Sequence, residues 1–324
     1  MKRWLALVLA AILVAVALVG CGQDDSADTE EERPDVKVVG SQEFFDRADA
    51  MPAFEEAYGF ELADEQKIAL ATGDTAVTEK AAAEGTDGAN AAMAYGTDGT
   101  IAALDLVVLG DPKGVQPIYQ PAPIFRKAII DEYPQIPMLL EPAFAMLDLQ
   151  VLQSLNAKVA IEGTDPGAVA QEWLESEGFL PGAGGDAKGP IVVGSKIDIE
   201  GPVLGEIMIK LLEGDGFEVT DKTRTGATDV VRKALLAGEI DAYPEYTANA
   251  ITVFYADEAI DPAVLKDATM TYEEAARLDL EKAEIVWLAP APANNTWAVA
   301  VPREFSEKYD VKTLQDWADY INGK

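Results

Sequence analysis

Four aromatic side chains stand where the chain turns after a predicted strand, and together they could hold a cation. Tyr95 lies in "AMAYGTDG" and Tyr119 in "GVQPIYQPAP". In the second half of the chain, Tyr246 lies in "DAYPEYTANA" and Trp297 in "NNTWAVAV". The faces of aromatic rings attract positive charge, so four rings at facing strand ends could form a box around a cation. The alternative is that these rings only pack a hinge.

The composition argues against the common catalytic and metal sites. The 324 residues include no histidine, and Cys21 is the single cysteine, so histidine triads and thiolate clusters are excluded. Ser195 and Lys196 form the only candidate pair of nucleophile and base. We therefore expect no enzyme, no cofactor and no metal. Asp241 and Glu245 flank a turn, where we expect solvated or capping carboxylates.

The charge of the chain bears on its partners. Its 57 acidic and 25 basic side chains give a formal net charge of −32. Such a chain would be repelled by nucleic acid and by anionic membrane surfaces. The acidity fits either a salty habitat or an ordinary soluble exterior.

An internal repeat predicts the elements that position the aromatic residues. "VVGSQ" at 38–42 matches "VVGSK" at 192–196, and the two segments 72–85 and 225–243 share Thr-Gly-x-Thr-x-Val-x-x-Lys-Ala-x-x-x-Gly. The longer match is typical of a helix that ends at a glycine. Short apolar runs, "LVVLG" and "IVWLA", follow in both halves. The repeat predicts two related α/β lobes with mostly parallel sheets, whose ligands lie beyond the carboxyl ends of the strands.

The first residues are typical of an exported protein. Lys2 and Arg3 precede an apolar run that ends at Gly20 and Cys21. This arrangement predicts a signal peptide over residues 1–20 and resembles a lipobox, in which the cysteine is lipidated. An uncleaved membrane anchor is the alternative. The acidic residues 21–34 are predicted to act as a tether.

Longer motifs in both halves resemble one family. They include "EFFDRADAMPAFEEAYGF", "LNAKVAIEGTDPGAVAQEWLESEGFL", "GATDVVRKALLAGEIDAYPEYTANA" and "APANNTWAVAVPREFSEKYDVKTLQDWADYI". These segments resemble the substrate-binding proteins of osmoprotectant ABC transporters, which bind glycine betaine, proline betaine or choline. The resemblance implies a two-lobed type II periplasmic-binding-protein fold, in which helices flank a mixed sheet in each lobe and the ligand cleft lies between the lobes.

The resemblance also implies a set of ligand-binding residues: Tyr95, Tyr119, Tyr246, Trp297, Lys196, Arg47 and Asn249. The four aromatic residues would form the box, and Lys196 with Arg47 would hold a ligand carboxylate. Asn249 stands where threonine is common and could still donate a hydrogen bond. Gly201 replaces a usual glutamine.

The order of the two halves is reversed relative to that family. The resemblance implies a circular permutant in which "PGAGGDAKG", at 181–189, joins the family's usual end to its usual start. It implies one discontinuous lobe from 35–110 and 298–324. The other lobe, 111–297, would be continuous and contain the joint.

The implied function is transport. The chain would be a lipid-anchored receptor on the extracytoplasmic face of the cell membrane, binding glycine betaine or a related quaternary-ammonium osmoprotectant and delivering it to the permease subunits of an ABC importer. The alternatives are a binding protein for choline or another small polar solute, an enzyme, or a sensor ectodomain on the same fold.

Overall fold

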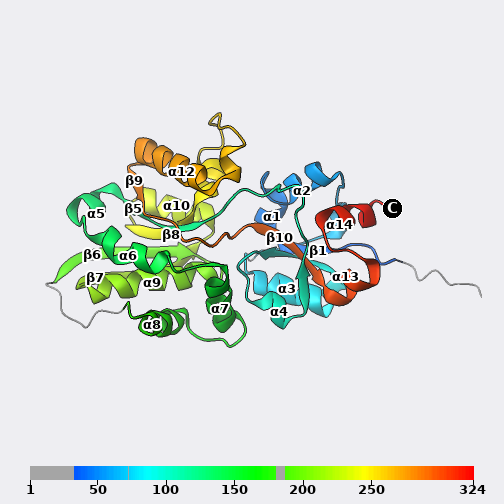
Figure 1. The fold of residues 1–324 in the computed structure, drawn as a ribbon, viewed down its shortest axis with the longest axis horizontal. Helices are drawn as coiled ribbons and strands as arrows, with labels where there is room; N and C mark the ends of the chain where they lie inside the picture. Colours follow the sequence, from blue (N-terminus) through cyan, green and yellow to red (C-terminus); the bar gives the residue numbers. More distant parts are fainter. Residues whose placement is uncertain (1–32, 72, 180–186) are drawn as a thin grey trace, which may run out of the picture. The chain divides into compact units, whose positions relative to one another are not determined.

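The computed structural model describes residues 33–71, 73–179 and 187–324. Residues 35–324 form one compact unit that contains two five-stranded sheets with helices packed on them (Figure 1). The predicted signal peptide, Cys21, nearly all of the tether and most of the 181–189 joint lie outside the described residues. In the described ranges, no helix is both long and apolar enough to cross a membrane.

The first sheet has the strand order β2-β1-β3-β10-β4. Its strands are β1 (Val38–Ser41), β2 (Lys67–Leu70), β3 (Ala91–Tyr95), β4 (Leu106–Val108) and β10 (Trp297–Pro302). Strand β10 is antiparallel to both of its neighbours, and the other pairings are parallel. The helices of this part are α1 (Gln42–Asp46), α2 (Met51–Tyr58), α3 (Thr75–Glu84), α4 (Thr100–Ala103), α13 (Arg303–Tyr309) and α14 (Leu314–Ile321), with 3₁₀ turns at Asp64–Gln66 and Thr86–Gly88.

The second sheet has the strand order β7-β6-β8-β5-β9. Its strands are β5 (Pro121–Arg126), β6 (Lys188–Lys196), β7 (Phe217–Gly226), β8 (Ala242–Tyr246) and β9 (Ile285–Trp287), and β5 is the antiparallel one. Its helices are α5 (Lys127–Glu132), α6 (Ile136–Phe144), α7 (Leu149–Ala160), α8 (Pro166–Glu177), α9 (Glu200–Gly214), α10 (Thr228–Leu236), α11 (Thr247–Asn249) and α12 (Ala268–Ala283), with a π-helical turn at Ala250–Phe254 and a 3₁₀ turn at Val264–Lys266.

The two sheets repeat one topology, which confirms the predicted α/β fold of type II. Strands β1 to β4 occupy the same places in the first sheet as β6, β7, β8 and β9 occupy in the second. The fourth place of each sheet is filled by an antiparallel strand that comes from the other half of the repeat. The chain therefore crosses between the sheets twice, at 109–120 and at 288–296.

The repeated helices form as their sequences predict. Asp74 caps α3 by accepting a hydrogen bond from the backbone N–H of Ala76, and α3 ends at Gly85 with φ of 67°. Helix α10 is followed by Gly238, with φ of 70°. Glycine adopts this left-handed conformation without the steric cost that a side chain adds, so each helix ends where the repeat places its glycine.

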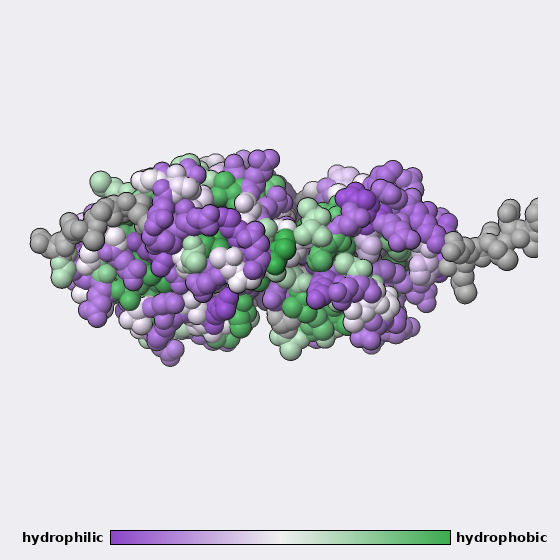
Figure 2. Space-filling view, turned by 90° about the horizontal axis from the view of Figure 1, so that it is seen from below, coloured by the Kyte–Doolittle hydropathy of each residue, from purple (hydrophilic) through white to green (hydrophobic). Residues whose placement is uncertain are grey.

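Each sheet carries an apolar core, and a few charged side chains, among them Glu79 and Glu245, are buried as well. Phe44, Phe54 and Trp317 are fully buried on the first sheet, and Phe125 and Phe144 on the second. Figure 2 shows that hydrophilic residues cover most of one face of the molecule and that hydrophobic residues reach this surface in smaller patches, one of them near its middle.

Candidate functional site

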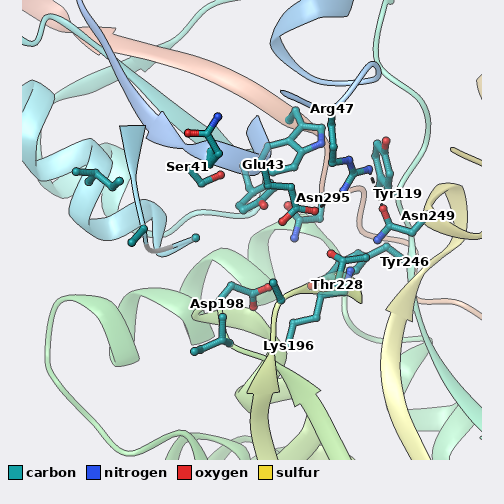
Figure 3. Close-up of a pocket in the computed structure, with 18 residues that line it drawn as sticks. Ser41, Glu43, Arg47, Tyr119, Lys196, Asp198, Thr228, Tyr246, Asn249 and Asn295 are labelled. Carbon is teal, nitrogen blue, oxygen red and sulfur yellow. Dashed lines mark hydrogen bonds and ion pairs between the residues drawn. The ribbon is translucent and has the colours of Figure 1, made fainter. Parts of the chain in front are cut away.

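A cavity of about 520 Å³ is lined by residues that come from both sheets and from the crossing segments. Lys196, Asp198 and Thr228 lie on one side of it, and Ser41 and Glu43 face them from the other side (Figure 3). All seven residues of the predicted site line this cavity: Tyr95, Tyr119, Tyr246, Trp297, Lys196, Arg47 and Asn249. A cavity of this volume accommodates a small solute.

The strand order explains why these residues meet. Tyr95 is the last residue of β3, and Lys196 and Tyr246 are the last residues of β6 and β8. The carboxyl ends of parallel strands lie at one edge of a sheet, so each sheet presents its strand ends to the cavity. Trp297 begins β10, which runs antiparallel, and it pairs in register with Tyr95. The centroids of these two rings are 4.6 Å apart.

The aromatic residues are walls of the cavity and also members of the core. Tyr119, Tyr246 and Trp297 are only 3–5% exposed and belong to the apolar cluster of the first sheet. The centroid of the Trp297 ring lies 5.4 Å from that of the Phe44 ring, and Trp297 also contacts Tyr95. The same three side chains therefore pack in the core and line the cavity.

Lys196 is paired with a carboxylate of its own chain. Its Nζ lies 2.7 Å from Oε1 of Glu245 and 4.7 Å from the centroid of the Tyr246 ring. Glu245 is completely buried, so the expectation that it is solvated or capping is wrong. Burial acts to raise the pKa of Glu245, but the charge and hydrogen bond of Lys196 outweigh it, with help from Asn249, and hold that pKa below its ordinary value.

Asp241 is also not simply solvated. It forms an ion pair with Arg126 at 3.0 Å and accepts a hydrogen bond from the backbone N–H of Val192 at 2.9 Å. This carboxylate ties the start of β8 to its neighbours β5 and β6. Its role is structural, and it does not line the cavity.

Arg47 is the second cation of the cavity and is also paired. Its guanidinium donates to Asp49 at 2.6 and 2.9 Å and to Glu43 at 2.9 Å. A further bond of 3.0 Å reaches Oδ1 of Asn249, which belongs to the second sheet's half. Burial opposes the charge of Arg47, yet the bonds to Asp49 keep its pKa above the ordinary value. The guanidinium carbon Cζ of Arg47 lies 5.5 Å from the centroid of the Trp297 ring.

Asp198 adds a carboxyl group to the cavity close to Lys196. Burial raises the pKa of Asp198 to about 6, against the opposing effects of the Gly201 N–H and the Lys196 charge. The Gly201 N–H donates to Oδ1 of Asp198 at 2.6 Å. A Cβ at position 201 would lie 2.8 Å from the carbonyl oxygen of Lys196. The glycine that replaces the family's glutamine therefore permits this close turn.

Glu200 is not among the predicted site residues, although it holds Tyr246 and Asn295 of the cavity wall in place. Its Oε1 accepts from the Tyr246 hydroxyl at 2.8 Å and from Asn295 Nδ2 at 3.0 Å, and its Oε2 accepts from Asn156 Nδ2 at 2.8 Å. Asn156, which lies on α7 beside the second sheet, also donates to the carbonyl of Thr97, which follows β3 of the first sheet. Only the position of Glu200 after the "GSK" strand could have pointed to it.

A buried pair of carboxyl groups supports Tyr95 from behind. Asp98 accepts from the Tyr95 backbone N–H at 2.6 Å and from the Thr75 hydroxyl at 2.8 Å. Glu79 accepts a hydrogen bond from the Thr100 hydroxyl. Burial raises the pKa of Glu79 to about 7, and burial together with Glu79 raises the pKa of Asp98 well above its ordinary value.

The Ser195–Lys196 pair is not arranged as a nucleophile and a base. The Ser195 hydroxyl donates to the carbonyl of Lys196 and accepts from the N–H of Arg224, both at 2.8 Å. The Lys196 ammonium points instead to Glu245. Among the described residues, no cluster of acidic, histidine or cysteine side chains could hold a metal ion.

Comparisons with known proteins place the chain among solute-binding proteins. The model of the family described as the substrate binding domain of ABC-type glycine betaine transport system matches residues 24–176 and 189–323. The glycine betaine-binding protein YehZ of Escherichia coli is 56% identical over 143 residues, which are 44% of this chain and 47% of that protein.

A glycine-betaine-binding protein of Pseudomonas aeruginosa is 33% identical over 39% of this chain and 38% of its own length. The solved structure of apo YehZ from Escherichia coli is 57% identical over 44% of this chain and 51% of that chain, with a TM-score of 0.34. The chain thus spans about half the length, or less, of the curated relatives it matches.

Proposed function

This chain belongs to the family of substrate-binding domains of ABC-type glycine betaine transport systems, and from that premise we propose that it is the solute receptor of an ABC importer. It captures glycine betaine or a related quaternary-ammonium compound in the cavity outside the cytoplasm and delivers it to the permease subunits. The observation that carries the proposal is the convergence of four aromatic side chains from both halves on one cavity.

The chemistry of the ligand fits these walls. A trimethylammonium group has no N–H to donate, so a hydrogen-bonding site cannot select it, whereas ring faces attract its charge and match its soft surface. Trp297 and Tyr95 supply neighbouring rings from the first sheet, and Tyr246 supplies one from the second. Tyr119 lies on the first crossing segment. In this proposal the four rings enclose the methyl groups.

The polar end of the ligand would be held by Lys196, Arg47 and Asn249. A carboxylate accepts charge-assisted hydrogen bonds from ammonium and guanidinium groups, and an amide can add one more. These three residues lie on different elements, so closing around a carboxylate would draw the two halves together. Contacts that exist only in the closed form are what drive such hinge motion.

The remaining parts of the proposal concern anchoring and chain order. We infer that Cys21 carries a lipid after removal of residues 1–20 and that the acidic tether sets the receptor off the membrane. We also infer a circular permutation with its joint at 181–189. The curated relatives align with less than half of this chain, which supports a changed order of the halves.

Calorimetric titration tests the proposed function. Residues 22–324, which include the whole compact unit, are titrated with glycine betaine, proline betaine, choline, carnitine and proline. The proposal expects heat of binding from quaternary-ammonium compounds and little from proline, which lacks the methylated nitrogen. Selective binding of proline, or binding of none of the five, would contradict it.

A further inference from the structure

The cation nearest the second sheet's strand ends already has a partner inside the protein. Lys196 is 8% exposed, and its Nζ contacts Oε1 of Glu245 at 2.7 Å while resting 4.7 Å from the centroid of the Tyr246 ring. The ammonium therefore stands on one face of the predicted box. A ligand that enters meets a lysine whose charge is paired and whose position is fixed.

The hydrogen bonds of Glu245 fix its carboxylate beside Lys196. Its Oε1 also accepts from the backbone N–H of Tyr246 at 2.7 Å and from Asn249 Nδ2 at 2.8 Å, and its Oε2 accepts from the Tyr243 hydroxyl at 2.8 Å. A fully buried carboxylate with four donors stays ionised, in keeping with its lowered pKa. It cannot swing away to free the lysine without leaving these donors unsatisfied.

Arg47, the other cation that lines the cavity, is also paired with carboxylates of the chain. Arg47 pairs with Asp49 and Glu43, and Asn249 links the two pairs by donating to Glu245 and accepting from Arg47. The two cations of the cavity thus face carboxylates of their own chain. A ligand carboxylate placed here adds a negative charge to groups that are already neutralised.

We propose that Glu245 is a specificity-determining residue: it is an internal counter-ion of Lys196 that competes with the carboxylate of a ligand and so reduces the advantage of zwitterions over quaternary-ammonium ligands with a net positive charge. The inference rests on the proposed function and adds the residue that sets the charge class of the ligand. Specificity here is a difference between two affinities, and the competition of Glu245 for Lys196 lowers only the affinity for a ligand that carries a carboxylate.

The test compares two ligands in two proteins. Calorimetry measures glycine betaine, a zwitterion, and its methyl ester, which keeps the trimethylammonium group but has no carboxylate. In the wild-type protein the paired lysine should leave glycine betaine with less than about a tenfold advantage over the ester. In Glu245→Gln the lysine loses its internal partner and becomes available to the ligand, so the affinity for glycine betaine should rise relative to that for the ester by about tenfold or more.

Asp279→Asn is the matched control. Asp279 is another fully buried carboxylate of the same half, paired with Arg232, and it does not line the cavity. Its replacement should leave the ratio of the two affinities unchanged. A merely structural role of Glu245 would weaken both ligands alike in Glu245→Gln, and that result would overturn the inference.

The remaining outcomes are also decisive. If Glu245→Gln does not fold, the wild-type ratio decides, because binding of glycine betaine more than about tenfold tighter than that of its ester contradicts an internal competitor. If both ligands bind and the ratio does not move in the variant, this inference fails and the proposed function stands. If no quaternary-ammonium compound binds the wild-type protein, both are overturned.

Discussion

Among single residues, Trp297 both packs in the core and lines the cavity. Its ring lies between those of Phe44 and Tyr95, at centroid distances of 5.4 and 4.6 Å, and it borders the cavity. Tyrosine is usual at this position in the family that the sequence resembles. The larger indole keeps a ring face and extends it, so the cavity wall is preserved by a different aromatic side chain.

Replacement of Trp297 measures how much its ring contributes. A desolvated cation–π contact is worth up to about 2 kcal/mol, so Trp297→Ala should weaken glycine betaine binding by roughly 30-fold in a calorimetric titration. Trp297→Phe keeps a ring and should retain much of the affinity. Unchanged affinity in the alanine variant would leave Trp297 with a packing role alone.

The residues of the cavity differ in how far the sequence could predict them. The aromatic residues recur at matching strand ends, so the repeat alone indicated them. Glu245 and Glu200 carried no such signal, because their importance comes from partners distant in the sequence. Lys196 lies 49 positions from Glu245, and only the pairing of β6 with β8 brings the two strand ends together.

At the level of elements, helix α3 connects the core of the first sheet to the cavity. It contributes Glu79 and Thr75 to the buried cluster beside Asp98, which in turn holds the backbone of Tyr95. The repeat motif predicts the helix and its glycine end. It does not predict the carboxyl cluster, because the second copy of the motif has no glutamate at the position of Glu79.

This cluster should make stability depend on pH. The folded-state pKa of Glu79 is raised from 4.5 to about 7, so the folded protein binds a proton that the unfolded chain releases. The associated stability is present below pH 4.5 and is lost as the pH rises through about 7, which amounts to about 3 kcal/mol. The raised pKa of Asp98 acts in the same direction.

Urea unfolding at pH 5 and pH 8 measures this effect. The wild-type protein should lose free energy of unfolding between the two values. Glu79→Gln keeps the shape and a neutral group, so its loss should be smaller by up to the same amount, and the variant should be the more stable protein at pH 8. An equal loss in both proteins would show that Glu79 does not carry the buried proton.

In the whole molecule, two exchanged strands tie the halves of the chain together. Strand β5 precedes the 181–189 joint but pairs with β8 and β9, and β10 follows the joint but pairs with β3 and β4. The sequence repeat predicted two related lobes. It could not by itself predict the exchange, because an antiparallel strand in the fourth place leaves no mark in the repeat motifs.

Limited proteolysis tests this connection. A protease of broad specificity should cut within the 181–189 joint, and the two fragments should elute together in size-exclusion chromatography because each contributes a strand to the other's sheet. Fragments that separate without denaturant would indicate independent halves instead.

The proposed membrane attachment also concerns the whole protein. If Cys21 is lipidated, Cys21→Ser should move the protein from the membrane fraction to the soluble fraction of the cell, because a polar, acidic tether alone has no affinity for lipid. Retention of the variant in the membrane fraction would favour an uncleaved apolar anchor.

A crystal structure of residues 22–324 with glycine betaine bound tests the central claim most directly. We expect the trimethylammonium nitrogen within about 6 Å of the ring centroids of Trp297 and Tyr246, inside the cavity that both sheets line. We also expect the ligand carboxylate near Lys196 and Arg47. A ligand seated elsewhere, with the four aromatic rings packed only against one another, would contradict the account.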